Sequence, residues 1–214
     1  MLPDHQTGPH PALIAILRGV TPEEALDVAS VLYEAGFRII EVPLNSPRPF
    51  QSIERIARAY GDRVLVGAGT VVAPEDVRPV AERSGRLILA PNFDPSVVSA
   101  TKAEGLLSVP GVATPTEAFS ALASGADILK LFPAEIITPA AVKALRAVLP
   151  PGTAMAPVGG ITPESMAPYV AAGASLFGIG SALYAPGCDL EDLARKAAAF
   201  IDRASALTLP EPAM

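Results

Sequence analysis

The chain has 214 residues, half of them hydrophobic, and a formal net charge of −6. This length supports one sizeable core, so we expect a single domain, and the acidic balance without a basic patch argues against a nucleic-acid partner. No apolar run is long enough to cross a membrane, and the first ten residues lack the basic and apolar regions of a signal peptide. We therefore expect a cytoplasmic protein without a membrane partner.

Cysteine and histidine usage argues against several kinds of active site. Cys188 is the only cysteine, so no intrachain disulfide can form, which fits a reducing cytoplasm. His5 and His10 both fall in the polar segment 1–10, which we expect to be a flexible leader. A folded region without histidine excludes most Ser–His, Cys–His and zinc sites, so we expect no metal.

Eight short apolar runs alternate with helical patterns along the chain, and each run predicts a strand. The predicted strands are residues 13–17, 39–44, 64–68, 87–91, 107–111, 128–132, 154–158 and 176–180. Helix start signals follow the strands. Thr-Pro-Glu-Glu at 21–24 offers a cap, a first-turn proline and acids at the positive end of the helix dipole, and related sequences stand at 73–76, 94–95, 114–117, 138–139 and 162–164. Four helices are predicted to end at left-handed glycines, namely Gly36, Gly105, Gly125 and Gly173.

Eight near-equal strand–helix units without a change in composition favour one α/β domain, a closed (β/α)₈ TIM barrel over residues 11–206. The alternative is a doubly wound open sheet. Residues 207–214 contain two prolines and are expected to form a tail. In such a barrel the chemistry lies at the carboxyl ends of the strands. The candidate residues found there are Arg18, Glu41 to Asn45, Gly69, Thr70, Pro91, Asn92, Gly111, Lys130 to Phe132, Gly159, Gly160, Gly180 and Ser181.

Of four lysines, Lys130 alone lies inside an apolar strand. Alternation places Lys130 and Phe132 on the inward face, and Leu129 and Leu131 toward the outer helices. Burial disfavours the charged amine, and a neutral amine attacks carbonyls to form an iminium. The residues alone fit a Schiff-base nucleophile and a charge partner about equally well. Phe132 can line a ligand site or simply fill the core.

Glu41 is the corresponding acid, placed between Ile40 and Val42 in an apolar strand. If it faces inward it approaches Lys130 across the barrel, where a carboxylate can move protons for iminium chemistry. A buried structural ion pair would explain both residues equally well.

Three further features suggest a ligand site. Arg18 ends the first strand and can bind a carboxylate through two hydrogen bonds, although a surface salt bridge is the alternative. Thr70 follows two glycines and offers a hydroxyl, although it can also cap the next helix. Glycine turns end the seventh and eighth strands, at Gly159–Gly160 and Gly180–Ser181, where barrels often bind phosphate; tight turn geometry is the alternative.

The segments EVPLNS (41–46), VGAGTV (66–71), APNFDP (90–95), PGVATPTEA (110–118), LKLFPAE (129–135) and VGGITPE (158–164) resemble the 2-keto-3-deoxy-6-phosphosugar aldolases. The resemblance spans roughly residues 11–205, and the motifs occur in family order. It implies a class I, Schiff-base, pyruvate-dependent aldolase on a (β/α)₈ barrel, which is a homotrimer without a metal cofactor. It assigns the Schiff base to Lys130, acid–base chemistry to Glu41, and phosphate binding to the two glycine turns.

The chain departs from the gluconate-type branch of this family. That branch carries an arginine in the motif after the catalytic glutamate and a threonine before the glycine pair. Here these positions hold Asn45 and Val158, and the arginine is Arg18. These choices resemble the galactonate-type branch. They imply cleavage of a 2-dehydro-3-deoxy-6-phospho sugar acid of galactonate configuration to pyruvate and D-glyceraldehyde 3-phosphate, with the gluconate epimer, or both, as the alternative.

A phosphosugar isomerase or epimerase is the rival enzyme class, with Glu41 as base and Lys130 as its charge partner. A phosphosugar-binding protein with a structural Lys130–Glu41 pair is the non-enzymatic rival.

Overall fold

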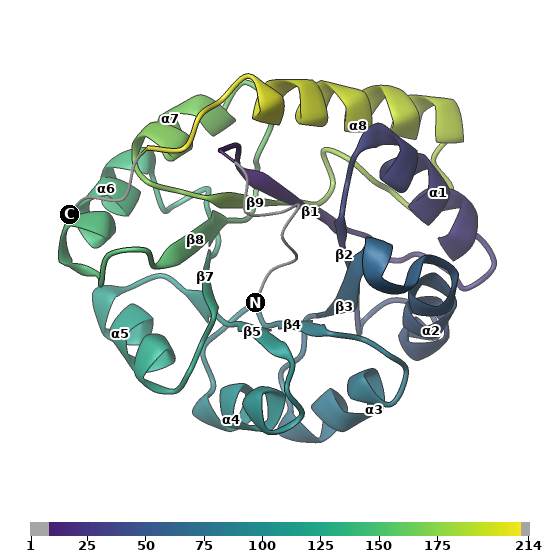
Figure 1. Ribbon diagram of the computed structural model, residues 1–214, viewed down its shortest axis with the longest axis horizontal. Coiled ribbons are helices and arrows are strands. Elements are labelled where there is room, and N and C mark those ends of the chain that lie inside the picture. The colour runs from purple at the N-terminus through teal and green to yellow at the C-terminus, as the bar shows by residue number, and fades with distance from the viewer. Residues whose placement is uncertain (1–8, 211–214) are drawn as a thin grey trace.

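The computed structural model describes residues 9–210. A ring of parallel strands is surrounded by helices (Figure 1), as expected for the (β/α)₈ barrel. The strands are β1 Ala12–Ile16, β2 Ile39–Pro43, β3 Leu65–Gly69, β4 Leu87–Leu89, β5 Leu107–Val109, β6 Gly111–Val112, β7 Ile128–Leu131, β8 Ala154–Pro157 and β9 Leu176–Ile179.

The ring contains two local departures from a regular ladder. The expected fifth strand is divided into β5 and β6 at Pro110, which has no N–H to donate. The Pro110 carbonyl still accepts a hydrogen bond from the Lys130 N–H at 3.0 Å, so β7 continues the sheet. A bridge between Val158 and Gly178 joins β8 to β9 and closes the ring.

An α-helix follows each strand of the ring except β5, which leads directly into β6. The α-helices are α1 Ala25–Ala35, α2 Pro49–Tyr60, α3 Val77–Ala81, α4 Pro95–Ala103, α5 Pro115–Ala123, α6 Pro139–Val148, α7 Met166–Ala171 and α8 Leu190–Ser205, with short 3-10 helices at Gly61–Arg63 and Pro74–Asp76. The predicted left-handed glycines all have positive φ, from 72° at Gly105 to 117° at Gly36.

The predicted helix starts are confirmed at three sites. Asp94, Thr114 and Thr138 cap α4, α5 and α6, each followed by proline. The Thr21 prediction is wrong by one turn, because α1 begins at Ala25. The Glu24 carboxylate instead accepts a hydrogen bond from the Thr21 N–H at 2.8 Å, so the loop after β1 is closed by a side chain before the helix begins.

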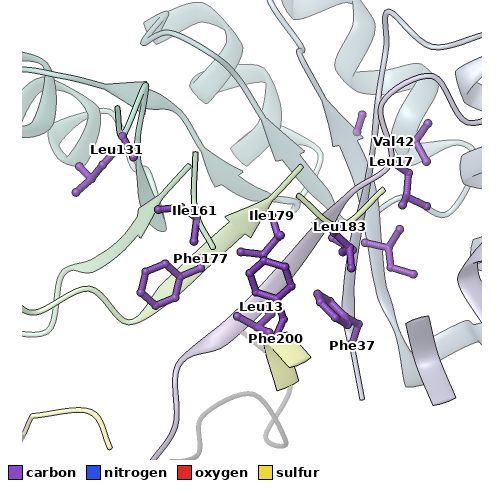
Figure 2. Close-up of a cluster of buried hydrophobic side chains, with 14 of the residues drawn as sticks. Leu13, Leu17, Phe37, Val42, Leu131, Ile161, Phe177, Ile179, Leu183 and Phe200 are labelled. Carbon is purple, nitrogen blue, oxygen red and sulfur yellow. The ribbon is translucent and has the colours of Figure 1, made fainter. Parts of the chain in front are cut away.

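Two apolar layers hold the barrel together. Inward side chains such as Ile14, Ile39, Leu65 and Ile128 fill the lower barrel. A second layer, which includes Phe177, packs between strands and helices (Figure 2). The inner layer supports the site, because residues further along the same strands stand above it.

Part of each expected terminal segment is ordered and packs against the barrel. Residues 1–8 and 211–214 lie outside the described residues. The Leu209 N–H donates to Pro9 O at 2.7 Å, and His10 Nδ1 lies 2.8 Å from Leu207 O. Leu207 and Leu209 are half-buried against the core. His10 therefore belongs to the folded part, contrary to expectation, but it precedes β1 and so lies away from the carboxyl ends of the strands. None of the helices between residues 9 and 210 has the length and apolarity to cross a bilayer.

Candidate active site

Lys130 and Glu41 are the charged side chains at the centre of the candidate site. They are 4% and 1% exposed, respectively. Each stands two residues beyond an inward apolar side chain, Ile128 on β7 and Ile39 on β2. Leu129 and Leu131 belong to the outer layer, which confirms the predicted faces of the strand. The pair therefore stands directly above the apolar filling of the barrel.

Gly69 makes room for the Glu41 carboxyl group. β2 and β3 pair in parallel with Glu41 opposite Gly67 and Pro43 opposite Gly69. A β-carbon on Gly69 would lie 1.2 Å from Glu41 Oε2, so any other residue would displace the carboxyl. Oε2 is buried and has no hydrogen-bond partner among the described residues. An unsatisfied buried acceptor is costly, and it is free to bond a ligand.

Burial moves both groups toward their neutral forms. It raises the pKa of Glu41, against the opposing charges of Lys130 and Arg18. It lowers the pKa of Lys130, which the Glu41 charge opposes and the Arg18 charge reinforces. Within residues 9–210 no ion pair joins the two side chains. The Lys130 Nζ lies 4.9 Å from the centre of the Phe132 ring, which places Phe132 beside the amine. This arrangement favours a neutral amine next to an acid that can exchange protons.

Arg18 lies in the loop after β1 and binds the loop after β2. Its Nη1 donates to Asn45 Oδ1 at 2.7 Å. The next residue, Gly19, donates its N–H to Ser46 Oγ at 2.9 Å. Arg18 takes part in no ion pair with the residues that the structure describes, so the salt-bridge alternative is not observed there.

Thr70 and Pro91 follow β3 and β4 at the same end of the barrel. Thr70 has a φ of 57°, a left-handed conformation that is unusual for a threonine. It does not cap the next helix, which begins after Ala73. The Pro91 carbonyl lies against Gly111, where a β-carbon would stand 2.3 Å from the oxygen. Gly111 therefore lets the loop after β4 approach β6 closely.

Val158, after β8, is buried against Gly178 of β9, where a β-carbon would stand 2.6 Å from its Cγ2. An apolar side chain thus occupies the position just before the two-glycine turn.

The two-glycine turn has a neighbour that the sequence analysis missed. Gly159 and Gly160 have φ values of 113° and 62°. The Glu135 carboxyl lies against them, so that a β-carbon on Gly159 would be 2.2 Å from Oε2. Gly180 faces open space, with no atom near its vacant β-carbon position. The sequence signal for Glu135 was its place five residues after Lys130 in LKLFPAE.

The described residues, 9–210, contain no cluster of three or more His, Cys, Asp or Glu side chains that could hold a metal ion. The predicted residues instead gather around a lysine, a carboxyl and an arginine. This set can bind a carboxylate, attack a carbonyl and transfer protons.

Comparison with known proteins gives consistent results. The family model for KDPG and KHG aldolase matches residues 9–198. The chain is 48% identical to the 2-dehydro-3-deoxy-6-phosphogalactonate aldolase of Escherichia coli K12, covering 88% of this chain and 92% of that protein. It is 46% identical to a probable 2-dehydro-3-deoxy-6-phosphogalactonate aldolase of Rhizobium meliloti, with 88% and 89% covered.

A solved structure described as "Native KDPGal structure" matches with a TM-score of 0.89 and 47% identity, covering 91% of this chain and 96% of that one. The match extends through most of the chain, so that protein shares the fold as well as the sequence. The chain belongs to the KDPG and KHG aldolase family.

Proposed function

We propose that this aldolase reversibly cleaves 2-dehydro-3-deoxy-6-phospho-D-galactonate to pyruvate and D-glyceraldehyde 3-phosphate, as a step of galactonate degradation. The observation that carries the proposal is Lys130, an amine 4% exposed at the carboxyl end of a barrel strand, facing Glu41 without a direct ion pair. A structural ion pair would be expected to close to hydrogen-bond distance, because burying unpaired charge is expensive.

The proposed reaction begins with attack of the neutral Lys130 amine on the C2 carbonyl. Glu41 supplies the proton that lets water leave the carbinolamine, and an iminium forms. Glu41 then accepts the proton of the C4 hydroxyl, the C3–C4 bond breaks, and its electrons pass into the iminium to give an enamine. Glyceraldehyde 3-phosphate leaves. Glu41 returns a proton to C3, and water releases pyruvate and the free amine.

The other predicted residues orient the substrate. Arg18 and Thr70 bind the carboxylate, and Pro91 and Phe132 cover the apolar side of the pyruvyl group. The phosphate binds to the turns at Gly159–Gly160 and Gly180–Ser181, which follow the last two strands of the barrel. The Glu135 carboxyl, which lies against the first turn, must turn away when the phosphate binds. No step requires a metal, because the protonated iminium withdraws the electrons.

The choice of the galactonate epimer has two supports. The E. coli and R. meliloti relatives both carry the phosphogalactonate name. Asn45 and Val158 stand where the gluconate-type branch carries an arginine and a threonine, which is the second support. Because Val158 offers no hydroxyl to the substrate, we expect weaker discrimination between the epimers than at a site that bonds a hydroxyl. The gluconate epimer, or both epimers, is the alternative.

The assembly is proposed to be a homotrimer that works in the cytoplasm. Ile136 and Val148 are 70% and 58% exposed and border an apolar groove of about 390 Å³ between α5 and α6, a surface suited to a subunit contact. The reducing compartment suits a chain with one cysteine.

The test is turnover with each purified epimer, measured as pyruvate release. We expect faster cleavage of the galactonate epimer and no cleavage of either by Lys130→Met. Equal or faster cleavage of the gluconate epimer would overturn the substrate assignment. Interconversion of a phosphosugar without pyruvate release would favour an isomerase, and ligand-dependent stabilisation without turnover would favour a binding protein.

A further inference from the structure

Two loops are joined at the mouth of the barrel by hydrogen bonds between consecutive residues. Arg18 and Gly19, after β1, bind Asn45 and Ser46, after β2, at 2.7 and 2.9 Å. Ser46 is 7% exposed, and its own N–H donates to Pro43 O at 2.9 Å. The loop that carries Asn45 is therefore anchored to the strand below it.

Asn45 is the residue to which the Arg18 guanidinium is bonded. The bond to Asn45 is the only side-chain hydrogen bond that Arg18 makes within residues 9–210. An arginine without such a bond samples many rotamers, and the entropy of ordering it is then lost on ligand binding. The charge of Arg18 acts on both Glu41 and Lys130, so Arg18 lies near the reacting groups, where the substrate carboxylate is proposed to bind.

The chemistry of the Asn45 amide suits this role. Its oxygen accepts one guanidinium N–H and leaves the other donors of Arg18 available for a carboxylate. Because the amide is neutral, it does not cancel the charge that attracts the substrate. An aspartate at this position would compete with the substrate carboxylate for the same guanidinium.

We propose that Asn45 is a positioning residue that holds Arg18 in the orientation that receives the substrate carboxylate, with Ser46 fixing the loop. The proposal rests on the role assigned to Arg18 in the proposed function. It assigns to Asn45 a contribution to carboxylate affinity and none to the bond-making steps at Lys130.

The experiment measures the rate of borohydride trapping of the iminium against pyruvate concentration. The variants are Asn45→Ala, Arg18→Ala and the double variant. The matched control is Arg48→Ala, which removes another bond between the same two loops, to Glu23 at 2.6 Å, without contacting Arg18. Hydroxyacetone, a ketone of similar size without a carboxylate, serves as the second probe.

We expect Arg18→Ala to weaken apparent pyruvate affinity on the order of 100-fold, as for loss of a charge-assisted pair. Asn45→Ala should weaken it roughly five- to tenfold, as for loss of one orienting hydrogen bond, with an unchanged limiting trapping rate. The double variant should be no worse than Arg18→Ala, and Arg48→Ala should match the parent. Trapping with hydroxyacetone should be equal in the parent and Asn45→Ala.

Three results would overturn the inference, and a fourth tests the role of Arg18 on which it rests. If Asn45→Ala keeps full pyruvate affinity, or if its effect adds fully to that of Arg18→Ala, Asn45 does not act through Arg18. If hydroxyacetone trapping falls in parallel, the residue supports the fold of the loop only. If Arg18→Ala itself leaves pyruvate affinity unchanged, the role of Arg18 in the proposed function fails, which is a separate outcome.

Discussion

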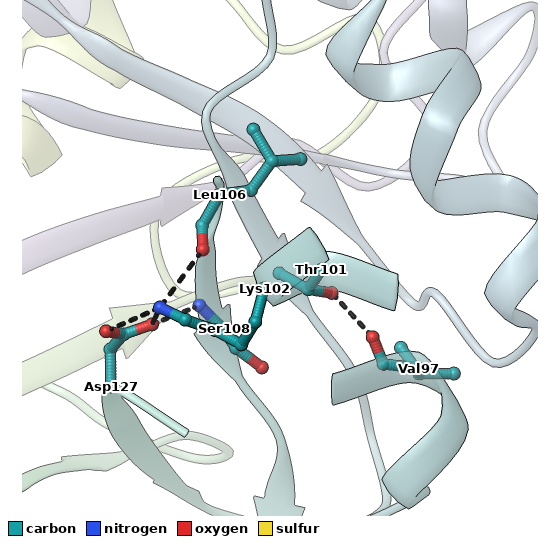
Figure 3. Close-up of polar contacts among 6 residues, drawn as sticks. All are labelled: Val97, Thr101, Lys102, Leu106, Ser108 and Asp127. Atoms are coloured by element: carbon teal, nitrogen blue, oxygen red, sulfur yellow. Dashed lines mark hydrogen bonds and ion pairs between the residues drawn. The ribbon is translucent and has the colours of Figure 1, made fainter. Parts of the chain in front are cut away.

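Two lysine–carboxylate pairs lie at the two ends of β7, and they differ in burial and in hydrogen bonding. Just before its start, Asp127 accepts hydrogen bonds from Lys102 Nζ at 2.7 and 2.9 Å and from the Ser108 N–H at 2.8 Å (Figure 3). Near its end, Lys130 faces Glu41, neither side chain makes a hydrogen bond to another of residues 9–210, and the Glu41 Oε2 is unsatisfied.

The comparison shows that one pair contributes to stability and the other to reactivity. The side chains of Lys102 and Asp127 are 37% and 30% exposed, so their charges stay hydrated and each hydrogen bond adds to stability. Lys130 and Glu41 are almost fully buried, which destabilises their charged forms but prepares an amine and an acid for chemistry. One barrel thus has a lysine that joins α4 to the start of β7 and a lysine that is kept reactive.

The largest expected effect is a difference in kcat between variants of the two lysines. Lys130→Met should lower kcat more than about 10⁴-fold, because the other lysines of residues 9–210 lie on the outer helices α4, α6 and α8, away from the substrate carbonyl. Lys102→Met, the matched control, should stay within about twofold of the parent, because it lies away from the mouth. The assay is pyruvate release from the phosphorylated keto acid. Substantial turnover by Lys130→Met would show that the buried lysine is a charge partner.

Alanine substitutions at two glycines of β3 should likewise differ, one lowering kcat and the other lowering stability. Gly69→Ala places a β-carbon 1.2 Å from Glu41 Oε2 and must move the carboxyl, so kcat should fall roughly 10²-fold, as for loss of a general acid–base. Gly67→Ala places a β-carbon 1.9 Å from the backbone oxygen of Leu87. This substitution should therefore mainly lower the free energy of unfolding. Parallel measurements of kcat and of the free energy of unfolding check this, and equal kcat values in the two variants would contradict it.

Removing both buried charges should stabilise the protein. The raised pKa of Glu41 contributes stability at acid pH that is lost as pH rises, and the lowered pKa of Lys130 contributes stability at alkaline pH that is lost as pH falls. Near neutral pH the pair is therefore unfavourable. Glu41→Gln with Lys130→Met should raise the free energy of unfolding by about 1–4 kcal/mol.

Lys102→Met provides the opposite case and should lower the free energy of unfolding by about 0.5–1.5 kcal/mol, since the pair is partly exposed. Urea unfolding of the two proteins at pH 7 measures both changes. A loss of stability in the double variant would identify the Lys130–Glu41 pair as a structural ion pair.

The smallest effect is a shift of a pH midpoint. The rate of borohydride trapping should reach half its maximum below pH 10.5, the ordinary pKa of lysine, because burial lowers the pKa of Lys130. Glu41→Gln should move the midpoint down and Arg18→Ala should move it up, since the Glu41 charge raises this pKa and the Arg18 charge lowers it. Shifts in the opposite directions would show that these charges do not act on the amine.

The sequence pattern within a single strand was enough to predict which residues of that strand face the site. Alternation in β7 placed Lys130 inward, and the apolar run around Glu41 predicted its burial. Contacts between strands were beyond such patterns. The fit of Gly69 to the Glu41 carboxyl depends on the register of β2 and β3, and the Arg18–Asn45 bond joins two loops 27 residues apart.

The fold shows the same limit. The alternation of strands and helices predicted the barrel, but not the break at Pro110, where a proline interrupts one strand without ending the sheet. The start of α1 was placed too early: the Glu24 side chain does bond back to the Thr21 N–H, as in a capping box, but the regular helix begins only at Ala25. Side-chain bonds of this kind depend on the folded loop and have no period in the sequence.

The most direct test of the reactive lysine is treatment of the intact protein with pyruvate and borohydride, followed by peptide mapping. We predict one reduced pyruvyl adduct per chain, on Lys130, and none on Lys102. No adduct on the folded protein in excess pyruvate, or an adduct on a different lysine, would contradict the account.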